Sequence, residues 1–509
     1  MTARVRTCAL VGVEARLVEV EADLGTGLPT FTIVGLPDAA VRESRERVLA
    51  AVRNCGYEFP ARRITINLAP AHVRKEGAGF DLPIAVALLL ASGQIPDGRP
   101  LAEGIFVGEL GLDGSVRAAR GVLAILGMAR RRGYGPVWLS RENARDARAL
   151  SDVPTSLLHT LGDLRGDAPR GPDAPSPAAA APPREPPPLD LAGVRGQDLA
   201  RRALEIAAAG GHNLLFVGPP GAGKTMLARA LPGILPPLSH EEAIEVTTIH
   251  SVAGRLQPGS GLIVHPPFRS PHHSISDAGM VGGGRGPLPG EASLAHGGVL
   301  FLDELPEFRR NVLEALRQPV EEGRITIVRV AGAVRFPASF SLVAAMNPCP
   351  CGFRGDARRG CRCGPDAVVN YWGKVSGPML DRIDLFLEVP ALDASRLLGR
   401  EQGEPSARVR ARVLAARARA LGRLGPARNA ALTTADLDRL DPLDPDTRRL
   451  LVLAVERFGL SARGVQRVRR VARTIADVAG DERVAGAHVA EALQFRAPVP
   501  HGGLGAHRR

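Results

Sequence analysis

One strand, loop and helix segment, NLLFVGPPGAGKTMLARAL, constrains the fold of this chain more than any other part of it. An apolar run at 214–217 leads directly into a glycine-rich loop, and an apolar helical pattern follows. In such loops the glycines let backbone N–H groups surround phosphates, a lysine reaches the terminal phosphates, and a hydroxyl ligates Mg²⁺. The residues of this P-loop are Gly218, Gly221, Gly223, Lys224 and Thr225. The segment therefore predicts a site for ATP and Mg²⁺ in a parallel α/β sheet.

A second buried-strand pattern, GGVLFLDELPEF, ends in two adjacent carboxylates, Asp303 and Glu304. We expect Asp303 to hold Mg²⁺ through water and Glu304 to polarise the water that attacks the γ-phosphate. Acidic residues are common at strand ends, so this pair alone is weak evidence. Together with the P-loop upstream, it predicts a site for ATP hydrolysis.

Three further polar residues stand beside apolar strands or helices. Asn347 ends the strand pattern FSLVAAMNP, where its amide can donate and accept at a γ-phosphate, although an Asn before Pro348 is also typical of a turn. Arg382 precedes another apolar strand in SGPMLDRIDLFLEV, and Arg463 begins a basic helix in SARGVQRVRRVART. Isolated arginines are usually solvated, so the residues alone do not decide their roles.

Four of the six cysteines crowd into one Arg- and Gly-rich loop after the Asn347 strand, as CxC, nine residues, then CxC. Four thiolates at this spacing predict a tetrahedral structural Zn²⁺ site, with free or redox-active thiols as the alternative. The four are Cys349, Cys351, Cys361 and Cys363. Cys8 and Cys55 are isolated, and we expect them to be small core residues.

Composition divides the chain into four parts. A stretch rich in proline and alanine, residues 166–188, cannot build a core and predicts a linker. Before it, residues 1–165 alternate β-rich runs with helical patterns, as in a compact mixed α and β domain. After it, residues 189–390 repeat strand, loop and helix, and residues 391–509 are helical almost throughout. The last part predicts a helical lid.

The charge and hydropathy of the chain indicate its surroundings. No apolar run approaches the roughly 18 residues of a membrane span, and the first residues carry charges where a signal peptide is apolar. We therefore expect a cytoplasmic protein with no membrane partner. The net charge of +12 favours a polyanion, and 4% aromatic residues imply an electrostatic grip rather than base stacking. Arginines at helical spacing are candidates for a phosphate-binding groove: Arg408, Arg412, Arg419, Arg463, Arg467 and Arg470.

Taken together, the P-loop, the DE strand, the Asn-tipped strand, the DRID segment and the SAR helix resemble an AAA+ ATPase. The strings FRSPHHSISDAGMVGGG, PGEASLAHGGVLFLDELPEF and NPCPCG are similar to the magnesium-chelatase-like branch, specifically the competence protein ComM/YifB family. The likeness runs nearly end to end. Residues 1–165 resemble a Lon-protease-type domain with the ribosomal S5-like fold.

This resemblance implies roles that the residues alone leave open. Asn347 corresponds to the first sensor, Arg382 to the arginine finger supplied to the neighbouring subunit's ATP, and Arg463 to the second sensor. A finger in trans implies a homo-oligomeric ring, in this family a hexamer. The resemblance further implies an ATP-driven helicase that binds single-stranded or branched DNA. Its activity would be branch migration during homologous recombination and natural transformation.

Two other functions are compatible with parts of the sequence. A magnesium-chelatase motor subunit fits the ATPase segment but not the fused amino-terminal domain or the cysteine loop. A Lon-like protease or unfoldase fits the amino-terminal domain, but Gly79 and Leu123 stand where the nucleophilic serine and the lysine would be. Lys75 either contacts phosphate or a neighbouring subunit, or it is a simple surface residue.

Two adjacent histidines, His272 and His273 in SPHHSIS, are also candidates for a functional role. The resemblance places them in an insertion before the DE strand. A DNA contact and a plain turn are both compatible with that position, and we assign no metal to them.

Overall fold

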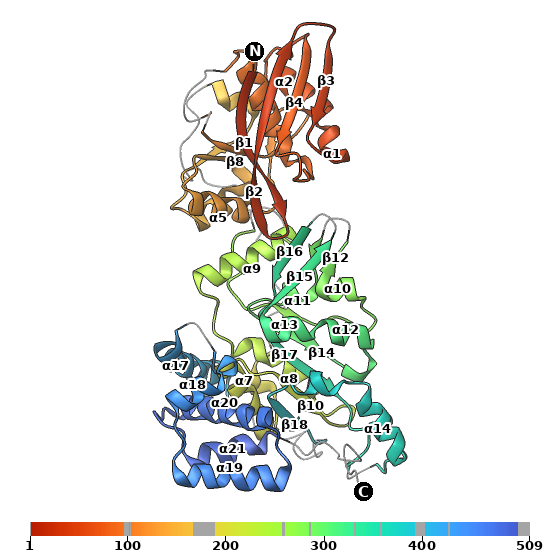
Figure 1. Cartoon of the computed structure of the whole chain (residues 1–509), viewed down its shortest axis with the longest axis vertical. Coiled ribbons are helices and arrows are strands. Elements are labelled where there is room, and N and C mark those ends of the chain that lie inside the picture. The colour runs from red at the N-terminus through yellow and green to blue at the C-terminus, as the bar shows by residue number, and fades with distance from the viewer. Residues whose placement is uncertain are drawn as a thin grey trace. The chain divides into compact units, whose positions relative to one another are not determined.

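The computed structural model describes most of the chain in nine stretches and one single residue. These are residues 2–95, 101, 103–165, 189–256, 260–284, 287–329, 332–356, 359–391, 403–425 and 428–496. Contacts divide the chain into two compact units (Figure 1). Unit 1 is Met1–Glu185 with His240–Ile263 and Val328–Phe336, and unit 2 is Pro186–Ser239 with Val264–Ile327 and Pro337–Arg509.

Unit 1 is built on a seven-stranded mixed sheet with the order β3-β4-β2-β1-β5-β8-β9. The long antiparallel pair of β1 and β2 is drawn in red in Figure 1. Strand β2 is antiparallel to its two neighbours, β1 and β4, whereas β5, β8 and β9 run parallel to one another. The strands span Thr2–Val11 (β1), Glu14–Gly25 (β2), Thr30–Val34 (β3), Arg63–Ala69 (β4), Ile105–Val107 (β5), Val137–Ser140 (β8) and Thr155–Leu158 (β9).

Side chains from alternate positions of these strands enter two separate apolar cores. Ile105 and Val107 of β5 join one core and Phe106 joins the other, because successive side chains of a strand point to opposite faces. The helices α2 (Ser44–Asn54) and α3 (Asp81–Ala91) pack into the Phe106 core, and α5 (Val122–Arg132) packs into the second. The sheet of this mixed α and β unit is thus covered on both faces.

Unit 2 contains a five-stranded sheet with the order β11-β14-β17-β10-β18, in which every pairing is parallel. Every residue of β10, β14 and β17 is buried, as is usual for parallel strands covered by helices on both faces. The strands span Leu214–Val217 (β10), Phe268–Arg269 (β11), Val299–Leu302 (β14), Ser341–Met346 (β17) and Leu385–Glu388 (β18). This sheet agrees with the α/β architecture predicted for residues 189–390.

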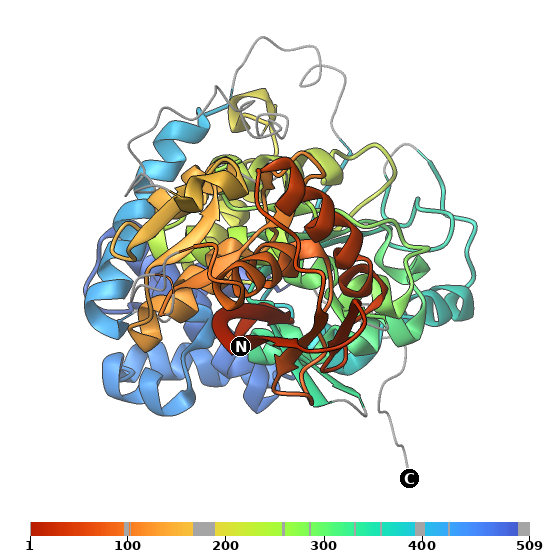
Figure 2. The same cartoon turned by 90° about the horizontal axis from the view of Figure 1, so that it is seen from above.

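The last described part of unit 2 is helical, and its helices are blue in Figures 1 and 2. The longest two, α17 and α20, pack against each other and against α7 (Asp198–Gly210). Ser461 caps the first turn of α20, and a left-handed Gly480 ends the helix. The helices span Ser406–Leu424 (α17), Thr434–Leu440 (α18), Pro445–Phe458 (α19), Ala462–Ala479 (α20) and Gly486–Gln494 (α21).

The division by contacts differs in one respect from the four parts read from composition. Helix α9 (His240–Val252) and part of the β15–β16 pair (Arg324–Arg329 and Gly332–Pro337) group with unit 1, although they lie within residues 189–390 of the chain. The predicted linker, 166–188, lies outside the described residues, as do 392–402 at the predicted start of the lid. None of the described helices is long and apolar enough to cross a membrane.

For three of the helical arginines, Arg412, Arg467 and Arg470, the structure corrects the prediction of a groove for phosphates. Arg412 forms ion pairs with Glu205 and Glu404. Burial lowers the pKa of Arg470, whose guanidinium donates to a backbone carbonyl. Arg467 is also buried, so the groove is wrong for these three residues; Arg408 and Arg463 are exposed.

Lys75 is likewise not the exposed residue that the sequence suggested. Its side chain is fully buried, and its ammonium group donates to the carbonyl of Pro70 at 2.5 Å. Burial lowers the pKa of Lys75. A contact to phosphate is therefore wrong for this residue. Gly79 lies in a short 3₁₀ turn, Ala78–Phe80, and Leu123 is buried in α5.

Candidate ATP site

The P-loop connects β10 to α8 (Lys224–Ala230) at the carboxyl edge of the parallel sheet. Gly221 and Gly223 have left-handed φ values of 77° and 89°, which favour glycine. A Cβ atom at Gly218 would lie 2.2 Å from the carbonyl oxygen of Val389. The loop conformation therefore depends on these glycines, and their positions agree with the sequence pattern.

The side chain of Lys224 lies inside the loop. Its ammonium group donates to the carbonyls of Gly218 at 2.6 Å and Pro219 at 2.9 Å, and to Oδ1 of Asn347 at 3.1 Å. Burial lowers the pKa of Lys224, and the nearby carboxylates of Asp303 and Glu304 act in the opposite direction. The structure thus brings the P-loop lysine together with Asn347, which follows the adjacent strand β17.

The candidate magnesium ligands also lie together. The hydroxyl of Thr225 donates to Oδ2 of Asp303 at 2.7 Å, and the other Asp303 oxygen accepts from the backbone N–H of Glu304 at 2.9 Å. A hydroxyl and a carboxylate in contact are hard oxygen donors of the kind that Mg²⁺ takes beside substrate phosphates. The donor set therefore fits Mg²⁺.

Glu304 begins the turn after β14 with a left-handed φ of 53°. Its side chain is 62% exposed and lies 3.5 Å from Nδ1 of His273, measured from Oε2. His273 follows β11, the strand paired with β14, so the two residues meet at the same edge of the sheet. His272 instead bonds the hydroxyl of Ser274 at 2.8 Å. This contact of His273 was not predicted, although the residue lies only four positions after the end of β11.

An open pocket of about 470 Å³ adjoins Glu304 and Asn347. Lys374 lines it and forms an ion pair with Glu307 at 3.1 Å. Burial raises the pKa of Tyr371, in the same lining, to about 12, so this hydroxyl stays protonated at neutral pH. Sequence analysis assigned no role to Lys374, although it is one of only three lysines in the chain.

The four cysteines of the loop after β17 come together. Their sulfur atoms all lie within 4.8 Å of one another. Backbone N–H groups of Phe353 and Arg362 lower the pKa of the Cys351 thiol, whereas the pKa values of Cys361 and Cys363 are raised, in part by the neighbouring thiols, so one thiol of the cluster ionises most readily. This donor set is compatible with structural Zn²⁺. A Cβ atom on Gly352 would lie 2.7 Å from Pro220, so the loop packs directly on the P-loop.

The two remaining arginines lie apart from the P-loop hydrogen bonds. Arg382 donates to the carbonyl of Pro378 at 2.7 Å and forms an ion pair with Glu321. Among the described residues, no hydrogen bond joins it to the phosphate loop. Arg463 is 71% exposed and lies 3.9 Å from Asp381.

Arg467 lies one helical turn after Arg463 and, unlike Arg463, is buried. Its guanidinium bonds the carbonyl of Ile383 at 3.1 Å and a carboxylate oxygen of Asp381 at 3.1 Å. It thereby ties α20 to the segment that carries Arg382. Sequence analysis did not separate the structural arginine from the exposed one, because both lie in the same basic run.

Comparisons with known proteins show the family of the chain. Profiles described as magnesium chelatase subunit ChlI match residues 190–397 and 20–143, and its C-terminal profile matches 403–496. The chain is 44% identical to the uncharacterized protein YifB of Salmonella typhimurium, over 97% of this chain and 96% of that protein. It is also 44% identical to the competence protein ComM of Haemophilus influenzae, over 96% of both chains. A magnesium-chelatase 67 kDa subunit of Heliobacterium mobile is 27% identical over 40% of this chain and 34% of its own.

The sheet, the P-loop and the carboxylate strand define a magnesium-chelatase-like protein of the AAA+ class. Within that class, the chain belongs to the ComM/YifB family. The family suggests ATPase activity with ATP and Mg²⁺.

We predict that purified protein carries one zinc ion per chain, held by the four clustered thiolates. Metal analysis of wild type should detect it, and Cys361→Ser should lose it and melt at a lower temperature. Cys55→Ser, outside the cluster, is the matched control and should keep the metal. Wild-type protein without zinc when purified under reducing conditions would contradict this prediction.

We also predict different effects for Arg463 and Arg467, two of the arginines of α20. Arg467→Ala should lower the melting temperature by roughly 5 °C, because it leaves backbone carbonyls and Asp381 without their partner. Arg463→Ala should leave the melting temperature unchanged but reduce ATP turnover, as expected for a sensor. Thermal denaturation and steady-state ATPase assays measure the two effects, and an Arg463→Ala variant with normal turnover would remove the sensor assignment.

Proposed function

We propose that this protein is an ATP-driven DNA motor that moves branch points during homologous recombination, including natural transformation. The observation that carries the ATPase part is the contact of Lys224 with Asn347 beside that of Thr225 with Asp303. Support for DNA as substrate comes from the relative named competence protein ComM and from the net charge of +12.

Each group of the site has a distinct task in hydrolysis. The P-loop amides and Lys224 bind the phosphates, which replace the carbonyls as partners of the ammonium group. Thr225 and Asp303 would hold Mg²⁺, which neutralises charge on the β- and γ-phosphates. Asn347 binds the γ-phosphate or the attacking water, and Glu304 accepts a proton from that water. For this step Glu304 leaves His273.

Arg382 completes the site of the neighbouring subunit. Its guanidinium is paired with Glu321, and among the described residues no hydrogen bond joins it to the P-loop of its own chain. A cation donated across an interface stabilises charge on the transferred phosphoryl group only when subunits are assembled. We therefore propose a ring, a hexamer, in which hydrolysis depends on assembly and the helical residues 391–509 act as a lid.

A magnesium-chelatase subunit is the second candidate, because the ChlI profiles cover most of the chain. The family relationship to ComM favours the DNA motor. Adding protoporphyrin or branched DNA to the same ATPase assay separates the two: only the true substrate should stimulate turnover.

Glu304→Gln should retain ATP binding and lose at least about 100-fold in turnover, because an amide cannot take the proton from water. The same variant should bind a synthetic four-way DNA junction yet fail to move its branch point. Glu456→Gln, an exposed acid on α19, removes the same charge and should behave as wild type. Normal branch migration by Glu304→Gln would overturn the ATP-powered mechanism.

Arg382→Ala should bind ATP normally and hydrolyse it about 1,000-fold more slowly. The finger assignment makes a sharper prediction for mixed rings. Lys224→Ala and Arg382→Ala proteins are each inactive alone, but mixing them should restore part of the turnover. In such rings an intact Arg382 faces an intact P-loop at some interfaces. Failure of every mixing ratio to recover activity would show that Arg382 acts within its own chain.

A further inference from the structure

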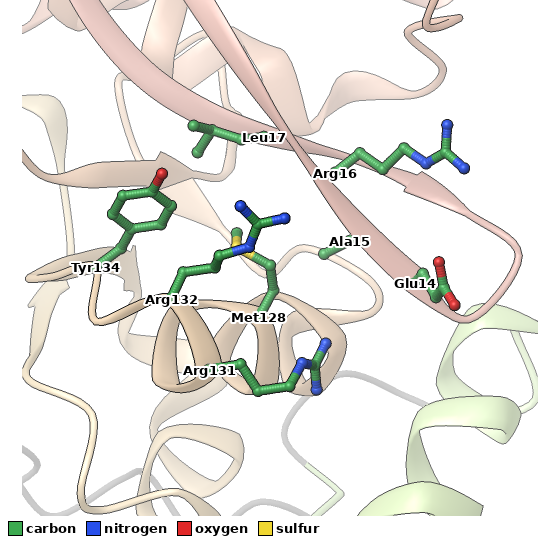
Figure 3. Close-up of a pocket in the computed structure, with 8 residues that line it drawn as sticks. All are labelled: Glu14, Ala15, Arg16, Leu17, Met128, Arg131, Arg132 and Tyr134. Atoms are coloured by element: carbon green, nitrogen blue, oxygen red, sulfur yellow. The ribbon is translucent and has the colours of Figure 1, made fainter.

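A second hollow lies in unit 1, between the β1–β2 hairpin and the end of α5, far along the chain from the P-loop (Figure 3). Its volume is about 490 Å³, which is within the usual range of small-ligand pockets. The residues that line it are Glu14, Ala15, Arg16, Leu17, Met128, Arg131, Arg132 and Tyr134. Three arginines and one acid give the lining a positive charge.

The pocket has an apolar floor and a charged rim. Ala15, Leu17 and Met128 provide the floor, and Arg132 extends from the end of α5 toward the space beside Tyr134 (Figure 3). Arg131 projects outward from the same helix end, and Arg16 lies across the strand from that floor. The guanidinium of Arg6 lies over the Tyr134 ring at 5.4 Å from its centroid.

The arginines at the pocket are not committed to acidic groups in unit 1. Among the described residues, no ion pair or hydrogen bond is found for the guanidinium groups of Arg16, Arg131 or Arg132. Their neighbour Arg130 differs, because it lies 3.8 Å from Asp152. A favourable effect on the end of the helix dipole explains basic residues in the last turn of α5, but it does not explain an apolar hollow beside them.

We propose that this pocket binds one nucleotide unit of a single-stranded DNA chain. The exposed guanidinium groups of Arg131, Arg132 and Arg16 suit phosphodiester oxygens, and an apolar floor beside an aromatic ring suits a base. The proposal rests on the proposed function. It adds that unit 1 is itself a DNA-binding part of the motor, with exposed positive charge beside an apolar hollow.

The test measures binding of the full chain to fluorescein-labelled oligo(dT) by anisotropy, over a salt series from about 50 to about 200 mM. Arg131→Gln with Arg132→Gln should weaken binding roughly tenfold or more, and should reduce the slope of log affinity against log salt by about 1.4. The matched control is Arg53→Gln with Arg130→Gln. It also removes two arginines from last helical turns, and it should bind as wild type.

A second measurement tests whether the pocket contacts a base of the bound strand. Wild type should bind an abasic strand less tightly than oligo(dT), and Tyr134→Ala should abolish that difference. ATPase activity without DNA should be unchanged in these pocket variants, which also excludes misfolding as the cause.

The outcomes separate this inference from the proposed function. If wild type binds DNA and the double pocket variant matches its control, the arginines only stabilise the helix end and the inference is wrong. If free thymidine monophosphate competes as well as the strand, the pocket is a mononucleotide site and the inference is again wrong. If wild type binds no DNA at all, the proposed function fails first.

Discussion

The hydrogen bond from the ammonium of Lys224 to Asn347 is the contact on which the candidate site depends. It joins the loop after β10 to the end of the neighbouring strand β17, while Thr225 joins that loop to Asp303 after β14. Parallel strands place their carboxyl ends at one edge of the sheet, so three distant segments of the chain meet there. Side chains that follow three different strands therefore meet beside the P-loop.

A buried polar network links the helical part of unit 2 to this sheet. His212, just before β10, bonds Asp384 at 3.3 Å and the hydroxyl of Thr474 on α20 at 2.7 Å. Arg473, also on α20, is fully buried and forms ion pairs with Asp441 and Asp477. Buried charges are stable only when paired, so these contacts hold the helices in a defined arrangement.

The arginines of the chain divide into two groups with different physical roles. Those of α17 and α20 are largely used inside unit 2, where Arg412, Arg467 and Arg473 satisfy carboxylates and backbone carbonyls. Those beside the pocket of unit 1 keep their guanidinium groups available. The net charge of +12 counts buried and exposed arginines alike. Only the surroundings of each arginine therefore distinguish a structural residue from a candidate phosphate ligand.

The sequence by itself determined the parts of the site that are local. The P-loop, the acidic pair after β14 and the four cysteines were all predicted from residues that are neighbours in the chain, where spacing fixes geometry. Tertiary structure decided what depends on distant segments: the approach of His273 to Glu304, the burial of Lys75, and the assignment of Arg467 rather than Arg463 to packing. A run of similar arginines on one helix gives no sequence signal for which of them faces the core. Only the fold, by setting which side of α20 meets Asp381 and Ile383, makes that choice.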